Sequence, residues 1–157
     1  MGIFTTKENI NKLLEPLRKS GKKVVVTNGC FDILHVGHTR YLEASKSKGD
    51  ILVVLLNSDF SVKKIKGESR PINSEADRAE ILCALNSVDF TLLFDEDSPV
   101  ELIKYIKPDV YTKGADYTME TLPEADIMIK NGTKVEFIEF VQGKSTTNTI
   151  NKISNKE

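Results

Sequence analysis

Blocks of apolar and polar residues alternate along the chain, and their spacing predicts strands and helices in turn. Residues 24–26 and 51–56 are continuously apolar, which is typical of parallel strands buried on both faces of a sheet. Residues 10–17 repeat apolar positions three and four apart, which predicts a helix with one buried face. Signals of these kinds place strands at residues 24–26, 51–56, 88–94, 109–112 and 135–140. They place helices at residues 5–20, 37–47, 75–86, 99–106 and 122–131, and a last helix after residue 145.

This regular alternation predicts an α/β fold. We expect a five-stranded parallel sheet with helices on both faces, a Rossmann-like three-layer sandwich. At 157 residues the chain is expected to form one domain, residues 1–157, with a substantial core. A capping box from Thr5 to Glu8 predicts the start of the N-terminal helix, within residues 1–20, which should pack on the domain edge and take no part in chemistry. Residues 62–67 are polar and lysine-rich, and we expect them to form a loop.

The stretch VVVTNGCFDILHVGH, residues 24–38, combines a buried strand, a glycine turn and the start of a helix. Such a unit forms an anion site, because backbone N–H groups and the helix dipole both favour negative charge there. His35 and His38 are three residues apart, so on a helix they share a face. Gly37 between them lets a ligand approach the backbone. The stretch predicts binding of a phosphate whose charge grows during a reaction.

A zinc site is the alternative interpretation of the two histidines. Helical zinc ligands are more often four residues apart, with a third ligand nearby. The chain has two histidines and two cysteines, and Cys30 and Cys83 show no metal-ligand spacing. We therefore favour phosphate binding and expect no metal held by the protein side chains alone.

Polar clusters follow four of the predicted strands. They are Asn28-Gly29, Asn57-Ser58-Asp59, Lys113-Gly114 and the run from Gly143 to Thr147. In an open parallel sheet, ligands bind outside the carboxyl ends of the strands. We therefore expect all four clusters to meet at one edge of the sheet, together with the histidines.

A basic cluster follows the second predicted strand: Lys63, Lys64, Lys66, Arg70 and Arg78. Such runs are often only solvated, but this one belongs to the same edge as the histidines and predicts a clamp for a phosphorylated substrate. Arg70 or Arg78 can hold a phosphate through two parallel hydrogen bonds, which a lysine cannot. Among the carboxylates, Asp59 is a candidate to bind a ribose or another hydroxyl-rich group, and Asp32 is expected to fix the turn.

The hydroxyl run Ser145-Thr146-Thr147 opens the last predicted helix. Ordinary N-capping by Ser145 explains the first residue alone. Three hydroxyls and free N–H groups at a helix start also suit the β and γ phosphates of a nucleotide. Because the run follows the last predicted strand, we expect it to join the phosphate site.

Composition narrows the class of protein. Charged residues make up 29% of the chain and the formal net charge is −1, so no basic excess suggests a nucleic-acid partner. Two cysteines at unrelated positions indicate a reducing compartment. No apolar run is long enough to span a membrane, and the N-terminus lacks the apolar core of a signal peptide. We expect a cytoplasmic protein that binds neither a membrane nor nucleic acid.

Residues 27–38, TNGCFDILHVGH, resemble the signature of the cytidylyltransferase-like nucleotidyltransferases. These proteins carry an HxGH motif and are related to class I aminoacyl-tRNA synthetases. The resemblance extends from about residue 22 to residue 153 and looks closest to the branch that makes ADP-heptose. That branch is matched by NSD at residue 57, KGxSRPxN at residue 66, KGxDY at residue 113 and STTN at residue 145.

The resemblance implies a role for each matching residue. His35 and His38 would stabilise the transition state at the α-phosphate. The backbone of Gly29, Cys30 and Phe31 would line the nucleotide. Contacts to the nucleotide or to substrate phosphates are implied for Lys46, Lys64, Lys66, Arg78, Lys113, Gly114, Ser145, Thr146 and Thr147. Lys46 lies eight residues after His38, about 12 Å along a helix, so it would have to reach toward a long triphosphate.

The implied activity is transfer of AMP from ATP to a sugar 1-phosphate. The expected acceptor is D-glycero-β-D-manno-heptose 1-phosphate, and the products are an ADP-sugar for lipopolysaccharide or surface-glycan synthesis and pyrophosphate. Mg²⁺ would accompany ATP, and the family tendency is a homodimer, with the N-terminal helix as one candidate contact. One alternative is CTP-dependent transfer to glycerol 3-phosphate or a related alcohol phosphate. The approach VQGK at residues 141–144 departs from the pattern of those enzymes. A second alternative is a non-catalytic nucleotide-binding regulatory module.

Overall fold

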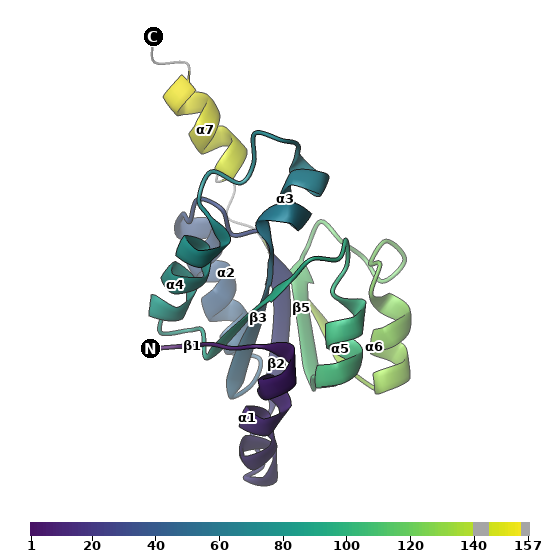
Figure 1. The fold of residues 1–157 in the computed structure, drawn as a ribbon. Coiled ribbons are helices and arrows are strands. Elements are labelled where there is room, and N and C mark those ends of the chain that lie inside the picture. Colours follow the sequence, from purple (N-terminus) through teal and green to yellow (C-terminus); the bar gives the residue numbers. More distant parts are fainter. Residues whose placement is uncertain (140–144, 155–157) are drawn as a thin grey trace.

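A fully parallel sheet forms the centre of the protein in the computed structural model, which describes residues 1–139 and 145–154 (Figure 1). Within these residues the sheet has six strands in the order β1-β4-β3-β2-β5-β6. The strands are β1 (Ile3–Phe4), β2 (Val24–Gly29), β3 (Ile51–Asn57), β4 (Phe90–Phe94), β5 (Val110–Gly114) and β6 (Lys134–Ile138). The prediction of five strands is therefore wrong by one. Strand β1 has two residues and pairs with β4, and two residues are too few to show any periodicity.

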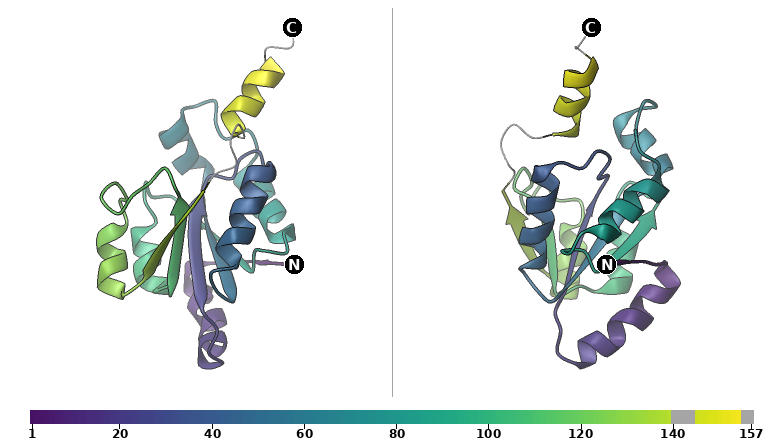
Figure 2. Two further views of the ribbon diagram at one scale, coloured as in Figure 1. Left: turned by 180° about the vertical axis from the view of Figure 1, so that it is seen from behind. Right: turned by 90° about the vertical axis from the view of Figure 1, so that its left-hand side faces the viewer.

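Helices cover both faces of this sheet, as the alternation predicts. They are α1 (Lys7–Lys19), α2 (Val36–Lys46), α3 (Asp59–Lys66), α4 (Glu75–Ala84), α5 (Val100–Ile106), α6 (Ala125–Asn131) and α7 (Thr146–Ser154). Buried residues of α1, α5 and α6 belong to one core cluster, and those of α2 and α4 belong to another. The sheet separates the two clusters, which gives the three layers seen in the two views of Figure 2.

Strand β3 shows how the sequence produces the layers. Because successive side chains of a strand point to opposite faces, Val53 and Leu55 enter the cluster under α1, α5 and α6. Leu52 and Val54 enter the cluster under α2 and α4. All seven residues of β3 are buried. This explains why the strand is a continuous apolar run with no polar alternation.

Two local predictions are wrong. Residues 62–67 were expected to form a loop, but most of them belong to α3, which Ser58 caps by accepting a hydrogen bond from the N–H of Ser61. Helix α1 begins one residue later than the Thr5 capping box predicts: Thr6 is its N-cap, and no side-chain hydrogen bond caps it. The helix still packs firmly, since Ile10 and Leu14 are fully buried.

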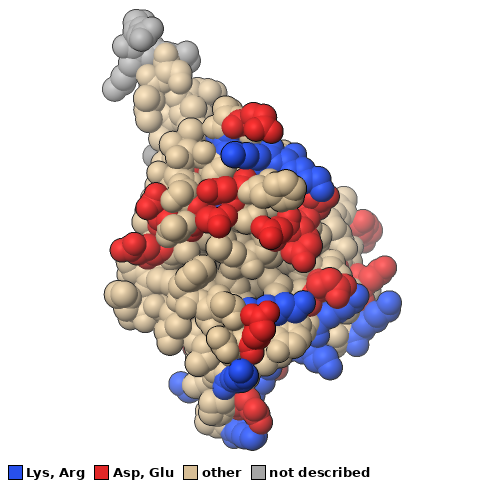
Figure 3. All heavy atoms as spheres, in the orientation of Figure 1, with Lys and Arg blue, Asp and Glu red and all other residues tan. Residues whose placement is uncertain are grey.

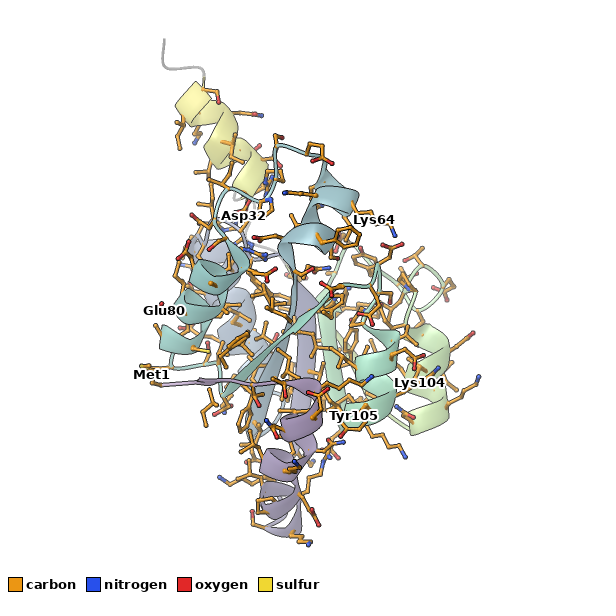
Figure 4. The ribbon with its side chains drawn as sticks, viewed as in Figure 1. Met1, Asp32, Lys64, Glu80, Lys104 and Tyr105 are labelled. Carbon is orange, nitrogen blue, oxygen red and sulfur yellow. The ribbon has the colours of Figure 1, made fainter. Side chains whose placement is uncertain are left out.

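The loops that follow the strands gather at one edge of the sheet, the upper edge in Figure 1, where α3 and the start of α7 also lie. Asp32 and Lys64 lie at this edge in Figure 4, whereas Lys104 and Tyr105 lie lower, at the end of α5. Helix α7 has no buried residue and projects beyond the body of the domain. None of the helices in the described part of the chain combines the length and apolar character needed to cross a membrane.

Candidate active site

A cavity of about 530 Å³ opens at the carboxyl edge of the sheet. Residues from the ends of β2 and β5 line it. These neighbouring strands are where the strand order reverses, with β3, β4 and β1 on one side and β6 on the other. Open parallel sheets bind ligands at this kind of position. The predicted residues that line the cavity are Asn28, Gly29, Cys30, Phe31, His35, Gly37, His38, Lys66, Arg70, Lys113, Gly114, Ser145, Thr146 and Thr147.

The two histidines form a reciprocal cap at the start of α2. His35 is the N-cap residue, and its Nδ1 accepts a hydrogen bond from the N–H of Gly37 at 3.1 Å. The Nδ1 of His38 accepts from the N–H of His35 at 3.4 Å. The rings stack with 3.9 Å between their centroids. They lie together because of this capping box, and not only because of the helical spacing that the sequence suggests.

These contacts set the tautomer that each ring has when it is neutral. A ring nitrogen that accepts a hydrogen bond carries no proton, so each neutral ring has its proton on Nε2. Burial, and secondarily the neighbouring imidazole of His35, lower the pKa of His38 to about 4. At neutral pH His38 is therefore an uncharged imidazole that donates through Nε2–H. The sequence suggested that a ligand can approach the backbone at Gly37. In the structure the N–H of Gly37 already donates to His35.

Phe31 shapes the floor of the cavity beside the histidines. Its ring meets the ring of His38 edge-on, with centroids 5.5 Å apart, and its backbone has a φ of 43°. A Cβ at Gly29 would lie 2.9 Å from the Phe31 ring, so a larger residue there would displace the ring. Burial raises the pKa of the Cys30 thiol. This opposes thiolate formation and leaves Cys30 as a neutral thiol in the cavity lining.

Asn28 joins the ends of β2 and β5. Its Oδ1 accepts hydrogen bonds from the Tyr111 hydroxyl at 2.6 Å and from Lys113 Nζ at 2.8 Å. Lys113 also lies over the Tyr117 ring at 5.0 Å. Burial lowers the pKa of Lys113, while Glu124 and Asp116 act to raise it. The ammonium is thus held at a fixed place in the cavity wall.

Asp32 fixes the turn, as the sequence suggested, and ties it to the segment before α4. Its carboxylate accepts from the N–H groups of Ile72 and Asn73 at 2.9 Å and from Arg70 Nε at 2.7 Å. Burial acts to raise the pKa of Asp32, but these donors outweigh it and the pKa is lowered. The contact holds Arg70 in the cavity wall, where a guanidinium suits a phosphate.

Arg78, which was predicted as a candidate phosphate clamp, is engaged inside the protein. Its side chain is completely buried and donates to the carbonyls of Cys30 and Asn73 and to Asp59. It is not among the residues that line the cavity. Three protein acceptors take its hydrogen bonds, which gives Arg78 a structural role. A substrate-binding role for Arg78 stays a prediction. Asp59 is likewise engaged with Arg78 and does not line the cavity.

The other three lysines predicted to contact phosphates lie in three different places. Lys66 lines the cavity. Lys64 pairs with Asp97 at 2.7 Å on the surface, where basic side chains lie beside acidic ones over α3 (Figure 3). Lys46 lies at the other end of α2, where its ammonium contacts Asp89 and the carbonyl of Asp50. Both of those residues precede strands, so Lys46 is at the amino edge of the sheet and the structure does not bring it to the site.

The start of α7 reaches the cavity. Ser145, Thr146 and Thr147 line it, and the Thr146 hydroxyl donates to the carbonyl of Ile33 at 3.3 Å. Ser145 Oγ accepts from the N–H of Asn148, so it caps the helix as the simpler interpretation predicts. Residues 141–144, which carry the VQGK approach, lie outside the described residues.

Several cavity residues were not singled out as site candidates: Tyr41, Asn57, Asp97, Asp116, Tyr117, Pro123 and Glu124. Asp116 and Tyr117 belong to the KGxDY segment, so that motif contained a signal for them. Tyr41 is three residues after His38 on α2 and shares its face. No local pattern marks Asp97 or Glu124, since each follows a strand through an irregular loop.

The described residues contain no group of three or more His, Cys, Asp or Glu side chains placed to hold a metal ion. Mg²⁺ is usually bound by one or two carboxylates together with substrate phosphates and water. The cavity carboxylates Asp97 and Asp116 fit that mode of binding.

Comparison with known proteins gives the family. The model of the cytidylyltransferase-like family matches residues 26–152. A bifunctional protein HldE from Aliarcobacter butzleri is 54% identical over 152 residues, covering 97% of this chain and 31% of that protein. HldE from Campylobacter fetus is 56% identical over 135 residues, which cover 86% of this chain and 29% of that protein. The chain thus spans about a third of the length of these relatives.

A solved structure agrees with this match. The lipopolysaccharide core biosynthesis protein from Thermoplasma volcanium superposes with a TM-score of 0.62 at 33% identity. The alignment covers 79% of this chain and 100% of that one. With the family match across most of the sequence, these relationships show that the chain belongs to the cytidylyltransferase-like family of nucleotidyltransferases.

Proposed function

We propose that the protein transfers AMP from ATP to a sugar 1-phosphate, D-glycero-β-D-manno-heptose 1-phosphate, and releases pyrophosphate. The resulting ADP-sugar would serve lipopolysaccharide core or surface-glycan synthesis. The observation that carries the proposal is the stacked pair His35 and His38, which lies in the cavity at the start of α2. The HldE relatives and the solved lipopolysaccharide core biosynthesis protein support the choice of acceptor.

The reaction needs little acid–base chemistry from the protein. An oxygen of the acceptor phosphate already carries negative charge, so it can attack the α-phosphorus without a general base. Negative charge then develops on the α-phosphoryl oxygens and on the departing pyrophosphate. The Nε2–H groups of His35 and His38 would donate to the α-phosphoryl oxygens. Fixed donors of this kind stabilise a transition state without reorganising.

Cationic side chains would complete the charge balance. Lys66, Arg70 and Lys113 line the same cavity from three different segments, and the start of α7 offers hydroxyls to the outer phosphates. Arg70 is held by Asp32, and Lys113 by Asn28. Their positions are therefore set before the ligands bind, which is the main contribution a protein makes to this kind of transfer.

Mg²⁺ would bind mainly through the triphosphate, with Asp97 and Asp116 as the available protein carboxylates. When bound, it neutralises phosphate charge and orients the leaving group.

Pyrophosphate release measures the proposal directly. The protein would be incubated with ATP, CTP or GTP against a panel containing heptose 1-phosphate, other sugar 1-phosphates and glycerol 3-phosphate. We expect release with ATP and heptose 1-phosphate. Turnover only with CTP and glycerol 3-phosphate would assign the other branch of the family, and nucleotide binding without release from any pair would indicate a regulatory module.

The proposal includes a cytoplasmic homodimer. Strand β1 is an edge strand whose Ile3 and Phe4 are half exposed, and α1 follows it, so this side of the domain is the proposed contact. Sedimentation analysis of the wild type and of a Phe4→Glu variant would test it, since a dimer formed there should dissociate in the variant.

A further inference from the structure

Glu124 is a buried carboxylate that the proposed chemistry does not use. It lines the cavity and is 2% exposed. Its Oε1 accepts a hydrogen bond from the Ser98 hydroxyl at 2.8 Å. Its Oε2 has no hydrogen-bond partner among the described residues. One oxygen of a buried carboxylate is thus fixed by the protein, while the other is buried at the cavity wall without a donor among the described residues.

An ordinary structural role does not account for this arrangement. Glu124 is the N-cap residue of α6, yet its side chain makes no capping hydrogen bond. Leaving a buried acceptor without a donor is costly. Two other buried side-chain atoms share this condition within the described residues, on Asn11 and Thr91, and neither residue lines the cavity. At Glu124 a ligand can supply the missing donor.

The surroundings of Glu124 indicate what kind of ligand group supplies it. Asp116 and Glu124 both act on Lys113, so this wall carries two carboxylates and one ammonium. That ammonium is engaged by Asn28. A phosphate placed directly against Glu124 would be repelled by its carboxylate. A hydroxyl group is a neutral donor, and a carboxylate oxygen can accept from two of them.

We propose that Glu124 recognises hydroxyl groups of a polyol ligand, with Oε2 accepting their hydrogen bonds while Ser98 holds Oε1. The inference rests on the proposed function, which provides two polyols: the acceptor sugar and the ribose of the nucleotide. Phosphates would then bind beside the histidines, Lys66, Arg70 and Lys113, and hydroxyls would bind at Glu124. The residue determines which ligand fits and has no bond-making role.

The variant Glu124→Gln tests this recognition. A glutamine can keep the acceptor for Ser98, but it replaces Oε2 by an NH₂ group that cannot accept. Glu120→Gln is the matched control, because Glu120 is an exposed carboxylate on the same loop and does not line the cavity. Thermal unfolding of both variants would verify that they fold as the wild type does.

Initial rates of pyrophosphate release would be measured against acceptor, ATP and 2′,3′-dideoxy-ATP. We expect Glu124→Gln to raise the KM of one ligand about 10- to 100-fold, the range for a hydrogen bond to a charged group, with a smaller change in kcat. A higher KM for the sugar 1-phosphate assigns Glu124 to the acceptor. A higher KM for ATP, together with an unchanged KM for the dideoxy analogue, assigns Glu124 to the ribose. Equal constants in wild type, Glu124→Gln and Glu120→Gln would overturn the inference.

Binding measurements separate this inference from the proposed function. If the wild type releases no pyrophosphate with any pair, the proposed function fails. The same ligands would then be compared by the shift they cause in the unfolding temperature. A shift by a sugar phosphate or ATP in the wild type that is lost in Glu124→Gln alone would support hydroxyl recognition. Identical shifts in all three proteins, including none, would reject it.

Discussion

Arg78 on α4 donates a hydrogen bond to the backbone carbonyl of Cys30, 48 residues earlier in the chain, at 2.5 Å. The same guanidinium donates to the carbonyl of Asn73 and to Asp59. It therefore joins the turn after β2, the segment before α4 and the start of α3. The loops that carry Phe31 and Arg70 into the cavity are held in place by a residue that does not itself line it.

Replacing Arg78 should therefore affect stability first. Arg78→Met keeps much of the apolar stem but leaves two backbone carbonyls without their donor, so we expect the free energy of unfolding to fall by about 2–4 kcal/mol. Urea denaturation measures it. Arg40→Met is the control, because Arg40 is exposed on α2, and it should change stability by less than about 0.5 kcal/mol. If Arg78→Met instead kept normal stability and raised the KM of the acceptor, the result would support a role of Arg78 as a phosphate clamp.

The two nitrogens of His38 can be tested separately. His38→Asn keeps an acceptor near the position of Nδ1, so the cap on His35 persists, but it removes the Nε2–H donor. We expect near-normal stability and a fall in kcat of about 100- to 1000-fold, as for loss of a donor to a developing oxyanion. His38→Gln keeps a donor near Nε2 and should retain more activity. Equal kcat in the wild type and His38→Asn would exclude His38 from the transition state.

The sequence predicted the features that depend on local pattern. Strand β3 is buried on both faces, so its apolar run needs no knowledge of its neighbours. The histidines of the HxGH stretch reach the cavity because strand, turn and helix follow one another directly. Helix α3 was missed because it is short, rich in lysine and buries only Ser61 and Val62, so it lacks the apolar stripe of a typical helix.

Roles that depend on distant partners could not be predicted. An arginine has the same donors whether they meet a phosphate or the carbonyl of Cys30, and only the fold shows that Arg78 meets the carbonyl. Glu124 was missed for the related reason that its partner, Ser98, is 26 residues away. Lys46 is a related case: its position on α2 can be predicted from the sequence, but its contact with Asp89, 43 residues later in the chain, cannot.

The lowered pKa of His38 predicts a specific pH dependence of stability. The folded pKa is about 4, against 6.5 for the free side chain. Below pH 6.5 the unfolded state binds a proton that the folded state does not, so stability falls as the pH decreases from 6.5 to about 4 and this contribution then levels off. The difference in pKa corresponds to at most about 3 kcal/mol.

Urea denaturation of the wild type and His38→Asn between pH 7.5 and 4 measures that contribution. The other titrating groups are common to both proteins, so the wild type should lose more stability across this interval. Parallel curves for the two proteins would show that the pKa of His38 is not lowered by folding.

The lysines at the two edges of the sheet should differ in their effect on catalysis. Lys66 lines the cavity, so we expect Lys66→Ala to raise the KM of a phosphorylated substrate about tenfold, more at low ionic strength because salt screens an exposed charge. Lys46 contacts Asp89 and the Asp50 carbonyl at the opposite edge. We therefore expect Lys46→Ala to keep kcat and KM within about twofold of the wild-type values. The loss of stability should be at most about 1 kcal/mol, as for a partly exposed ion pair. Steady-state kinetics of the two variants, at 50 and 300 mM salt, would compare them directly. A tenfold loss of kcat/KM in Lys46→Ala with unchanged stability would mean that its ammonium leaves Asp89 and reaches the triphosphate, as the family resemblance implied.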